Sequence, residues 1–207
     1  MRYCRITLTI LCFLLIPKFA HSAVTYEVLF DQSTYVGNPG DTLVANLLLR
    51  ETATEGDPNL IAPGNGLGSA NFRVAWTGTT DLISSLGGPG FISGGIDVEA
   101  DHVVVRQLAF PPGDAGVEVS QGVREVTIGT FEFQVPTMLG AEAVITPSDQ
   151  SLGSDFAIAA TPTTILDGDL TFRSSTISAV PEPTLLPLLG MAIAGVWNFR
   201  RPRRDRS

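Results

Sequence analysis

The stretch REVTIGTFEFQV, residues 124–135, alternates apolar and polar side chains in the way that a strand with one buried face does. The phase of this alternation changes near Gly129, which predicts a β-bulge, because one extra residue moves all later side chains to the opposite face. Val126, Ile128, Thr130 and Glu132 fall on one face of the alternation, opposite Phe131, Phe133 and Val135. The stretch therefore predicts a bulged, half-buried strand.

The rest of the body reads as strands joined by turns. SANFRVAW (69–76) shows the clearest alternation, and Phe72, Trp76, Phe131 and Phe133 are the expected centre of the core. Other predicted strands occupy residues 24–33, 42–51, 101–110, 141–148, 155–162 and 169–175. Residues 52–68 predict a long loop, and 78–95 a short apolar piece with a flexible glycine loop. No helical period occurs before residue 184, so the body is predicted to be an all-β sandwich of eight or nine strands.

Three segments of this body resemble landmarks of cohesin-like domains. They are GDTLVANLLLRE (40–51), GLGSANFRVAW (66–76) and REVTIGTFEFQV (124–135). The resemblance implies a jelly-roll or cohesin-like β-sandwich, related in fold to carbohydrate-binding modules. It does not imply a partner, because one fold serves many functions.

The amino-terminal residues 1–23 predict a cleaved secretory signal helix. Arg2 and Arg5 precede the apolar run 6–16, and small residues suited to cleavage follow in 17–23. A membrane anchor is the alternative, but the apolar run is short for a span of about 20 residues. Cleavage would remove both cysteines, so the mature chain would contain no disulfide.

The carboxyl-terminal residues 184–199 contain no charged side chain. Sixteen residues would form a helix of about 24 Å, and Trp197 at the interface would help it to cross a hydrocarbon core of about 30 Å. The arginines expected to hold the tail on the cytoplasmic side are Arg200, Arg201, Arg203, Arg204 and Arg206. The sequence thus predicts a signal (1–23), a sandwich (24–176), a linker (177–183), a single transmembrane helix (184–199) and a cytoplasmic tail (200–207).

Pro181, Glu182 and Pro183 come just before this segment. A Pro-Glu-Pro, an apolar segment and a terminal arginine cluster together resemble the PEP-CTERM sorting signal of exported bacterial proteins. The resemblance implies an exosortase as processing partner and a temporary anchor in the inner membrane. It also implies a final location at the cell surface or in the extracellular matrix of bacteria that make exopolysaccharide.

The charge of the body limits its ligands. Residues 24–179 hold 19 Asp and Glu against 5 Arg, a net charge of −14, which excludes nucleic acid as an expected partner. Calcium could bind to oxygen ligands, and the weak candidates are Asp97, Glu99, Asp101, Asp167 and Asp169. In DVEAD, Asp97, Glu99 and Asp101 would share one face of a strand. The alternative is that these residues form solvated acidic loops, and no other cofactor is expected.

No catalytic residues are predicted. His102 stands alone at the start of a strand, no GxSxG elbow occurs, and paired carboxylates arise by chance among so many acids. Sugar-binding platforms use exposed aromatic residues, and Tyr26 and Tyr35 could lie outside the core. We therefore expect a non-catalytic structural or interaction module that engages exopolysaccharide or other surface proteins. The alternatives are a carbohydrate-binding or cohesin-like adhesion module and, third, an enzyme acting on polysaccharide.

Overall fold

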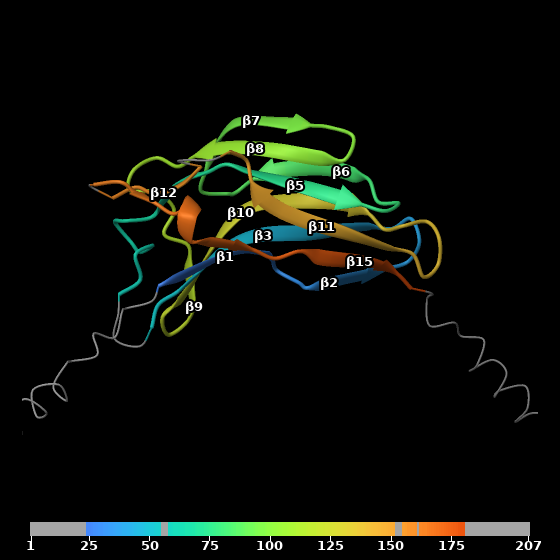
Figure 1. Cartoon of the computed structure of the whole chain (residues 1–207), viewed down its shortest axis with the longest axis horizontal. Helices are drawn as coiled ribbons and strands as arrows, with labels where there is room; N and C mark the ends of the chain where they lie inside the picture. Colours follow the sequence, from blue (N-terminus) through green and yellow to red (C-terminus); the bar gives the residue numbers. More distant parts are fainter. Residues whose placement is uncertain (1–23, 55–57, 152–154, 161, 181–207) are drawn as a thin grey trace, which may run out of the picture.

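The computed structural model describes residues 24–54, 58–151, 155–160 and 162–180. In these ranges the chain folds into two β-sheets (Figure 1), and its one helical element is a 3-10 turn, η1 (Asp167–Asp169). No helix of the described part has the length and apolar character needed to cross a membrane. The predicted signal helix and transmembrane helix lie outside the described residues.

The two sheets are built from strands that are distant in sequence. The first sheet has the order β14 (Leu170–Phe172), β1 (Thr25–Phe30), β3 (Thr42–Thr52), β10 (Val123–Gln134) and β6 (Leu82–Gly87), and β9 (Val117–Ser120) also pairs with β10. The second sheet has the order β13 (Thr164–Ile165), β12 (Phe156–Ile158), β4 (Leu67–Ala70), β8 (His102–Leu108), β5 (Phe72–Thr77), β11 (Glu142–Asp149), β15 (Ser175–Ala179) and β2 (Thr34–Gly37). In this sheet β7 (Ile92–Val98) pairs with β8 as well.

The prediction of an all-β sandwich is confirmed, but the strand count was wrong. The described residues contain fifteen strands, partly because single predicted strands are divided, as at Asn71 between β4 and β5. The expectation of a short apolar piece and a glycine loop in 78–95 holds only in part: β6 occupies 82–87 and a turn occupies 88–91, but Ser93, Gly94 and Gly95 belong to β7. A register shift between Ser93 and Gly95 accommodates the glycines within β7. At the carboxyl end β15 continues to Ala179, so it includes residues expected in the linker.

The bulge predicted near Gly129 is confirmed. The pairing of β10 with β3 shifts in register between Thr127 and Gly129. Before the shift Val126 and Ile128 are buried, and after it Phe131 and Phe133 are buried. The bulge thus keeps both halves of a 12-residue strand in contact with the core.

The core lies between the sheets, and aromatic rings fill its centre. Phe72, Trp76, Phe131 and Phe133 are all buried, as predicted. Phe131 and Phe133 stack with ring centroids 6.2 Å apart, and Phe72 meets Phe131 edge to face at 6.2 Å. Such contacts add to the stability that apolar burial already provides.

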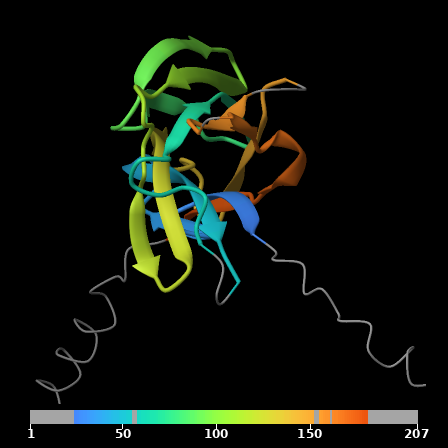
Figure 2. The same cartoon turned by 90° about the vertical axis from the view of Figure 1, so that its left-hand side faces the viewer.

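The first and last parts of the chain run side by side through both sheets. The β1 strand pairs in parallel with β14 in one sheet, and β2 pairs in parallel with β15 in the other. The start of β1 and the end of β15 lie at opposite ends of the sandwich (Figure 1). One end of the sandwich carries loops 53–66, 109–116 and 121–122, and we call it the loop end; it faces the viewer in Figure 2. The opposite end carries turns 38–41, 78–81 and 136–141, and we call it the exit end.

Candidate functional site

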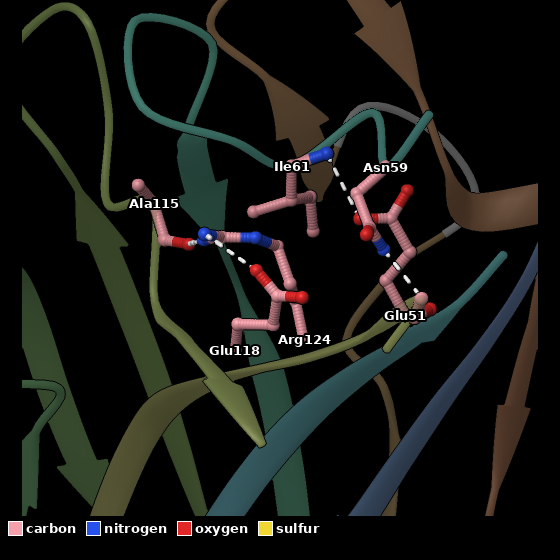
Figure 3. A network of polar contacts seen from close by, with 7 residues as sticks. Glu51, Asn59, Ile61, Ala115, Glu118 and Arg124 are labelled. Carbon is pink, nitrogen blue, oxygen red and sulfur yellow. Dashed lines mark hydrogen bonds and ion pairs between the residues drawn. The ribbon is translucent and has the colours of Figure 1, made fainter. Parts of the chain in front are cut away.

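The loop end contains a fully buried carboxylate, Glu51, near the last residue of β3 (Figure 3). Its two oxygens accept hydrogen bonds from the backbone N–H groups of Leu60 and Ile61, with N···O distances of 2.6 and 2.9 Å. The hydroxyl of Tyr26 donates a third bond at 3.3 Å. Burial first, and the nearby Glu51 charge second, raise the pKa of Tyr26, so its hydroxyl remains a donor. Glu51 therefore holds loop 53–66 against the sandwich.

Arg124 lies opposite Glu51 in the pairing of β10 with β3, but its guanidinium serves another loop (Figure 3). It donates a hydrogen bond to the carbonyl of Ala115 at 2.5 Å, and it lies 3.9 Å from Glu118. The side chain of Asn59 donates to the carbonyl of Gly122 at 3.2 Å. The side chains of Asn59 and Arg124 thus hold the loops of this end in place by hydrogen bonds to backbone carbonyl groups (Figure 3).

A second buried polar residue, Gln107, connects the two sheets behind the bulge. Its amide nitrogen donates to the carbonyl of Ile128 at 2.6 Å, and its oxygen accepts from the N–H of Gly88 at 2.9 Å. Ile128 lies at the register shift of β10, so Gln107 satisfies a carbonyl at the bulge. A Cβ on Gly87 would lie only 2.5 Å from the Gln107 oxygen, which explains a glycine there.

Three carboxylates, those of Asp149, Asp155 and Asp167, gather at the end of β11 and the start of β12. Burial, followed by a hydrogen bond with Asp155, raises the pKa of Asp149 to about 6. Asp155 is buried and also accepts bonds from the N–H and hydroxyl of Ser151, at 2.7 and 3.0 Å. Asp167 accepts from the N–H groups of Asp155 and Phe156, at 3.1 and 2.7 Å. Two of the three carboxylates therefore bind backbone donors, as expected for groups that fix loops.

The three acids of DVEAD do not share a strand face, so that expectation was wrong. Asp97 lies in β7 and forms an ion pair with Arg106, whereas Glu99 and Asp101 lie in the turn to β8. Asp101 accepts a hydrogen bond from His102, which lowers the pKa of this carboxyl. The turn forms because the N–H of Glu99 donates to the carbonyl of His102 at 2.8 Å.

The other two calcium candidates, Asp167 and Asp169, belong to the same 3-10 turn. The side chain of Asp167 already caps β12, and Asp169 is exposed. Throughout the described ranges, no three carboxylate, imidazole or thiol groups converge in a way that could hold a metal ion.

The tyrosines considered for sugar binding are buried, which overturns that expectation. Tyr26 packs against the core, and the Tyr35 hydroxyl donates a hydrogen bond to Asp31. Burial is the main reason that the pKa of Tyr35 is raised. Among the described aromatic residues, Phe110 has the largest recorded exposure, at 75%.

Phe110 belongs to an apolar groove at the loop end, beside the edge strand β7. The groove has a volume of about 250 Å³ and is lined by Ile92, Ser93, Gly94, Leu108, Ala109 and Phe110. Ile92 lies opposite Leu108 in the pairing of β7 with β8. The sequence reading missed this groove because it extended the strand to residue 110, whereas β8 ends at Leu108. The Pro111-Pro112-Gly113 that follows is the signal that could have placed Phe110 in a turn.

The predicted sorting and anchor residues lie outside the described part of the chain. They are Pro181, Glu182, Pro183, Trp197, Arg200, Arg201, Arg203, Arg204 and Arg206. Their roles stay predictions from the sequence. The structure does describe the residue before them, Val180, whose N–H donates to the carbonyl of Gly37 at 3.0 Å.

Comparisons with known proteins find similarity in structure only. No family model and no curated protein matches the chain. A non-cellulosomal cohesin from the hyperthermophilic archaeon Archaeoglobus fulgidus is similar at 13% identity and a TM-score of 0.46, covering 77% of this chain and 94% of that one. A type II cohesin domain from the cellulosome of Acetivibrio cellulolyticus gives 10% identity and a TM-score of 0.45, covering 74% and 95%. BcpA, the major pilin subunit of Bacillus cereus, gives 13% identity and a TM-score of 0.34, covering 76% and 39%. These values define neither a family nor a partner for this chain.

Proposed function

We propose that this chain is an exported bacterial surface protein whose β-sandwich is a non-catalytic interaction module, sorted by its carboxyl-terminal PEP-CTERM signal. The observation that carries the proposal is the position of the sorting tripeptide relative to the fold. The last strand, β15, ends at Ala179, and Pro181 follows two residues later. A cut by an exosortase beside the tripeptide would therefore release a sandwich with all its described strands.

Three buried or partly buried acids support a non-catalytic role. Glu51 and Asp167 accept bonds from backbone N–H groups, and Asp155 accepts bonds from Ser151. A general acid or base needs a carboxylate that can reach a substrate, and these three hold loops instead. The surface best suited to binding is therefore the apolar groove.

We assign the groove to an extended segment of another surface protein. Among described residues β7 pairs only with β8, so half of its backbone groups face away from the sheet. An added strand that pairs with Ile92–Gly94 would place an apolar side chain against Leu108 and Phe110. The net charge of −14 favours a segment with basic flanking residues. The register shift at Gly95 makes the edge less suited to pairing with a second copy of itself.

The sorting part is tested on protein isolated from the native host. Intact-mass analysis should find a mature carboxyl terminus near residues 180–184, and the double variant Pro181→Ala, Pro183→Ala should accumulate in the inner membrane. Two prolines keep the site extended and outside the following helix. Arginine-tailed protein as the main surface form, or normal release of the double variant, would contradict the proposal.

The binding part is tested by retention of the released protein on host cells that lack it. Phe110→Asp places a charge in the groove, so retention should weaken by roughly 30-fold, the equivalent of about 2 kcal/mol. Val117→Asp is the matched control, because Val117 is 69% exposed but lies on β9 in the other sheet. Equal retention of both variants would remove the groove from the proposal. Retention that survives protease treatment of the cells but not polysaccharide digestion would favour the carbohydrate-binding alternative instead.

A further inference from the structure

The exit end carries an exposed apolar tip beside the point where the chain leaves the sandwich. Met138 and Leu139, in the turn between β10 and β11, are 70% and 60% exposed. Val36 and Val180, both exposed, belong to the same end, because Ser178 lies opposite Val36 in the pairing of β15 with β2. We call Val36, Met138, Leu139 and Val180 the exit patch.

Backbone hydrogen bonds fix this tip to the last strand. The N–H of Gly140 donates to the carbonyl of Ala179 at 2.9 Å, and the N–H of Ala179 donates to the carbonyl of Ala141 at 3.0 Å. The N–H of Ala141 closes the turn by donating to the carbonyl of Met138 at 3.0 Å. Figure 1 shows this turn, in gold, next to the place where the chain departs from β15. The tip and the end of β15 therefore keep a fixed relation.

The sequence that follows Val180 indicates which surface the exit patch can contact. Only residues 181–183 separate Val180 from the sixteen uncharged residues 184–199. Three residues reach at most about 11 Å even when fully extended. With residues 184–199 in a bilayer, the exit patch lies within reach of the membrane interface.

We infer that, while the chain is anchored, Met138 and Leu139 insert into the interfacial region of the phospholipid bilayer. This inference rests on the proposed carboxyl-terminal anchor. The turns 38–41, 78–81 and 136–141 contain no Lys or Arg, but Asp41 and Asp81 lie in them and Glu142 begins β11 beside them. The contact is therefore apolar and does not require anionic lipid, which these acids would repel.

Two apolar side chains bind a bilayer weakly by themselves, as a single short lipid chain does. A short tether raises their effective concentration to the millimolar range, so the contact forms in the anchored chain and is lost after processing. Seated in this way, the sandwich points its loop end, with the groove at β7, away from the membrane.

Spin labels on the full chain in phosphatidylcholine vesicles test the inference. With Cys4→Ser and Cys12→Ser as background, Thr137→Cys reports on the tip and Thr163→Cys is the matched control, an exposed threonine at the loop end. Ala192→Cys reports on the anchor. Accessibility to oxygen relative to a water-soluble nickel complex should be several-fold higher at position 137 than at 163. The pair Met138→Ser, Leu139→Ser should abolish that difference.

The possible outcomes separate this inference from the proposed anchor. A label at 192 in lipid, with equal values at 137 and 163, overturns the membrane contact and leaves the anchor intact. A label at 192 in water overturns both. A label at 137 shielded from both reagents indicates a protein contact and also overturns the inference.

Discussion

The two ends of the sandwich are closed in different ways. At the loop end, long loops are held by buried polar side chains, above all Glu51 with its bonds to Leu60 and Ile61. At the exit end, the turn 136–141 is held by backbone bonds, such as that from Gly140 to Ala179, and its apolar side chains Met138 and Leu139 remain outside. The difference teaches which residues the fold requires. Side chains at the loop end hold long loops that have little strand pairing, whereas the exposed side chains of Met138 and Leu139 at the exit end are expected to add little to stability.

The largest effect is expected from Glu51→Ala. The change leaves two backbone N–H groups near the core without their acceptor, so the free energy of unfolding should fall by about 2–3 kcal/mol. Urea unfolding of the full chain measures it. Glu142→Ala, which removes an exposed acid at the exit end, should stay within about 0.5 kcal/mol of wild type. Equal losses in the two variants would erase the contrast between the ends.

A smaller, pH-dependent effect is expected from Asp149→Asn. The raised pKa of Asp149, about 6, means that the folded state favours the protonated carboxyl. Stability from this group is therefore present below the unfolded pKa of about 4 and is lost as pH rises through 6. The variant should unfold at a higher temperature than wild type at about pH 7.5, and the gap should narrow at about pH 5. A gap of the same size at both pH values would show that this carboxyl keeps its ordinary pKa.

The smallest effect on stability is expected from the pair Met138→Ser, Leu139→Ser. Both side chains are largely exposed, so the free energy of unfolding should change by no more than about 0.5 kcal/mol. Thermal unfolding in detergent solution, without a bilayer, measures it. A clear loss would mean that the tip stabilises the sandwich after all.

The alternation of apolar and polar residues was sufficient to predict the core strands but not the edge strands. The phase change at Gly129 located the bulge because a shift in strand pairing also changes which side chains face the core, and that change is visible in the sequence. In β7, Ser93, Gly94 and Gly95 have no apolar alternation, since an edge strand can bulge and expose both faces. An edge strand of this kind leaves little signal in one sequence.

The polar sites could not be predicted for a different reason. Glu51 ends the predicted strand 42–51 and looks like a polar residue at a solvated strand end, yet it is buried because the chain returns to it at Leu60. Asp167 was a calcium candidate, but backbone donors near Phe156 occupy its oxygens. Such contacts depend on how distant loops pack, which local spacing does not encode.

The parallel pairing of the first and last strands also bears on mechanics. A pull on Val24 and Val180 acts along the strands, so the β1–β14 and β2–β15 ladders would be sheared with many hydrogen bonds strained together. A pull on Val24 and Asp169 would instead unzip the first ladder one bond at a time. A domain tethered at both ends in flowing medium would therefore resist tension far better than the same domain peeled from one corner.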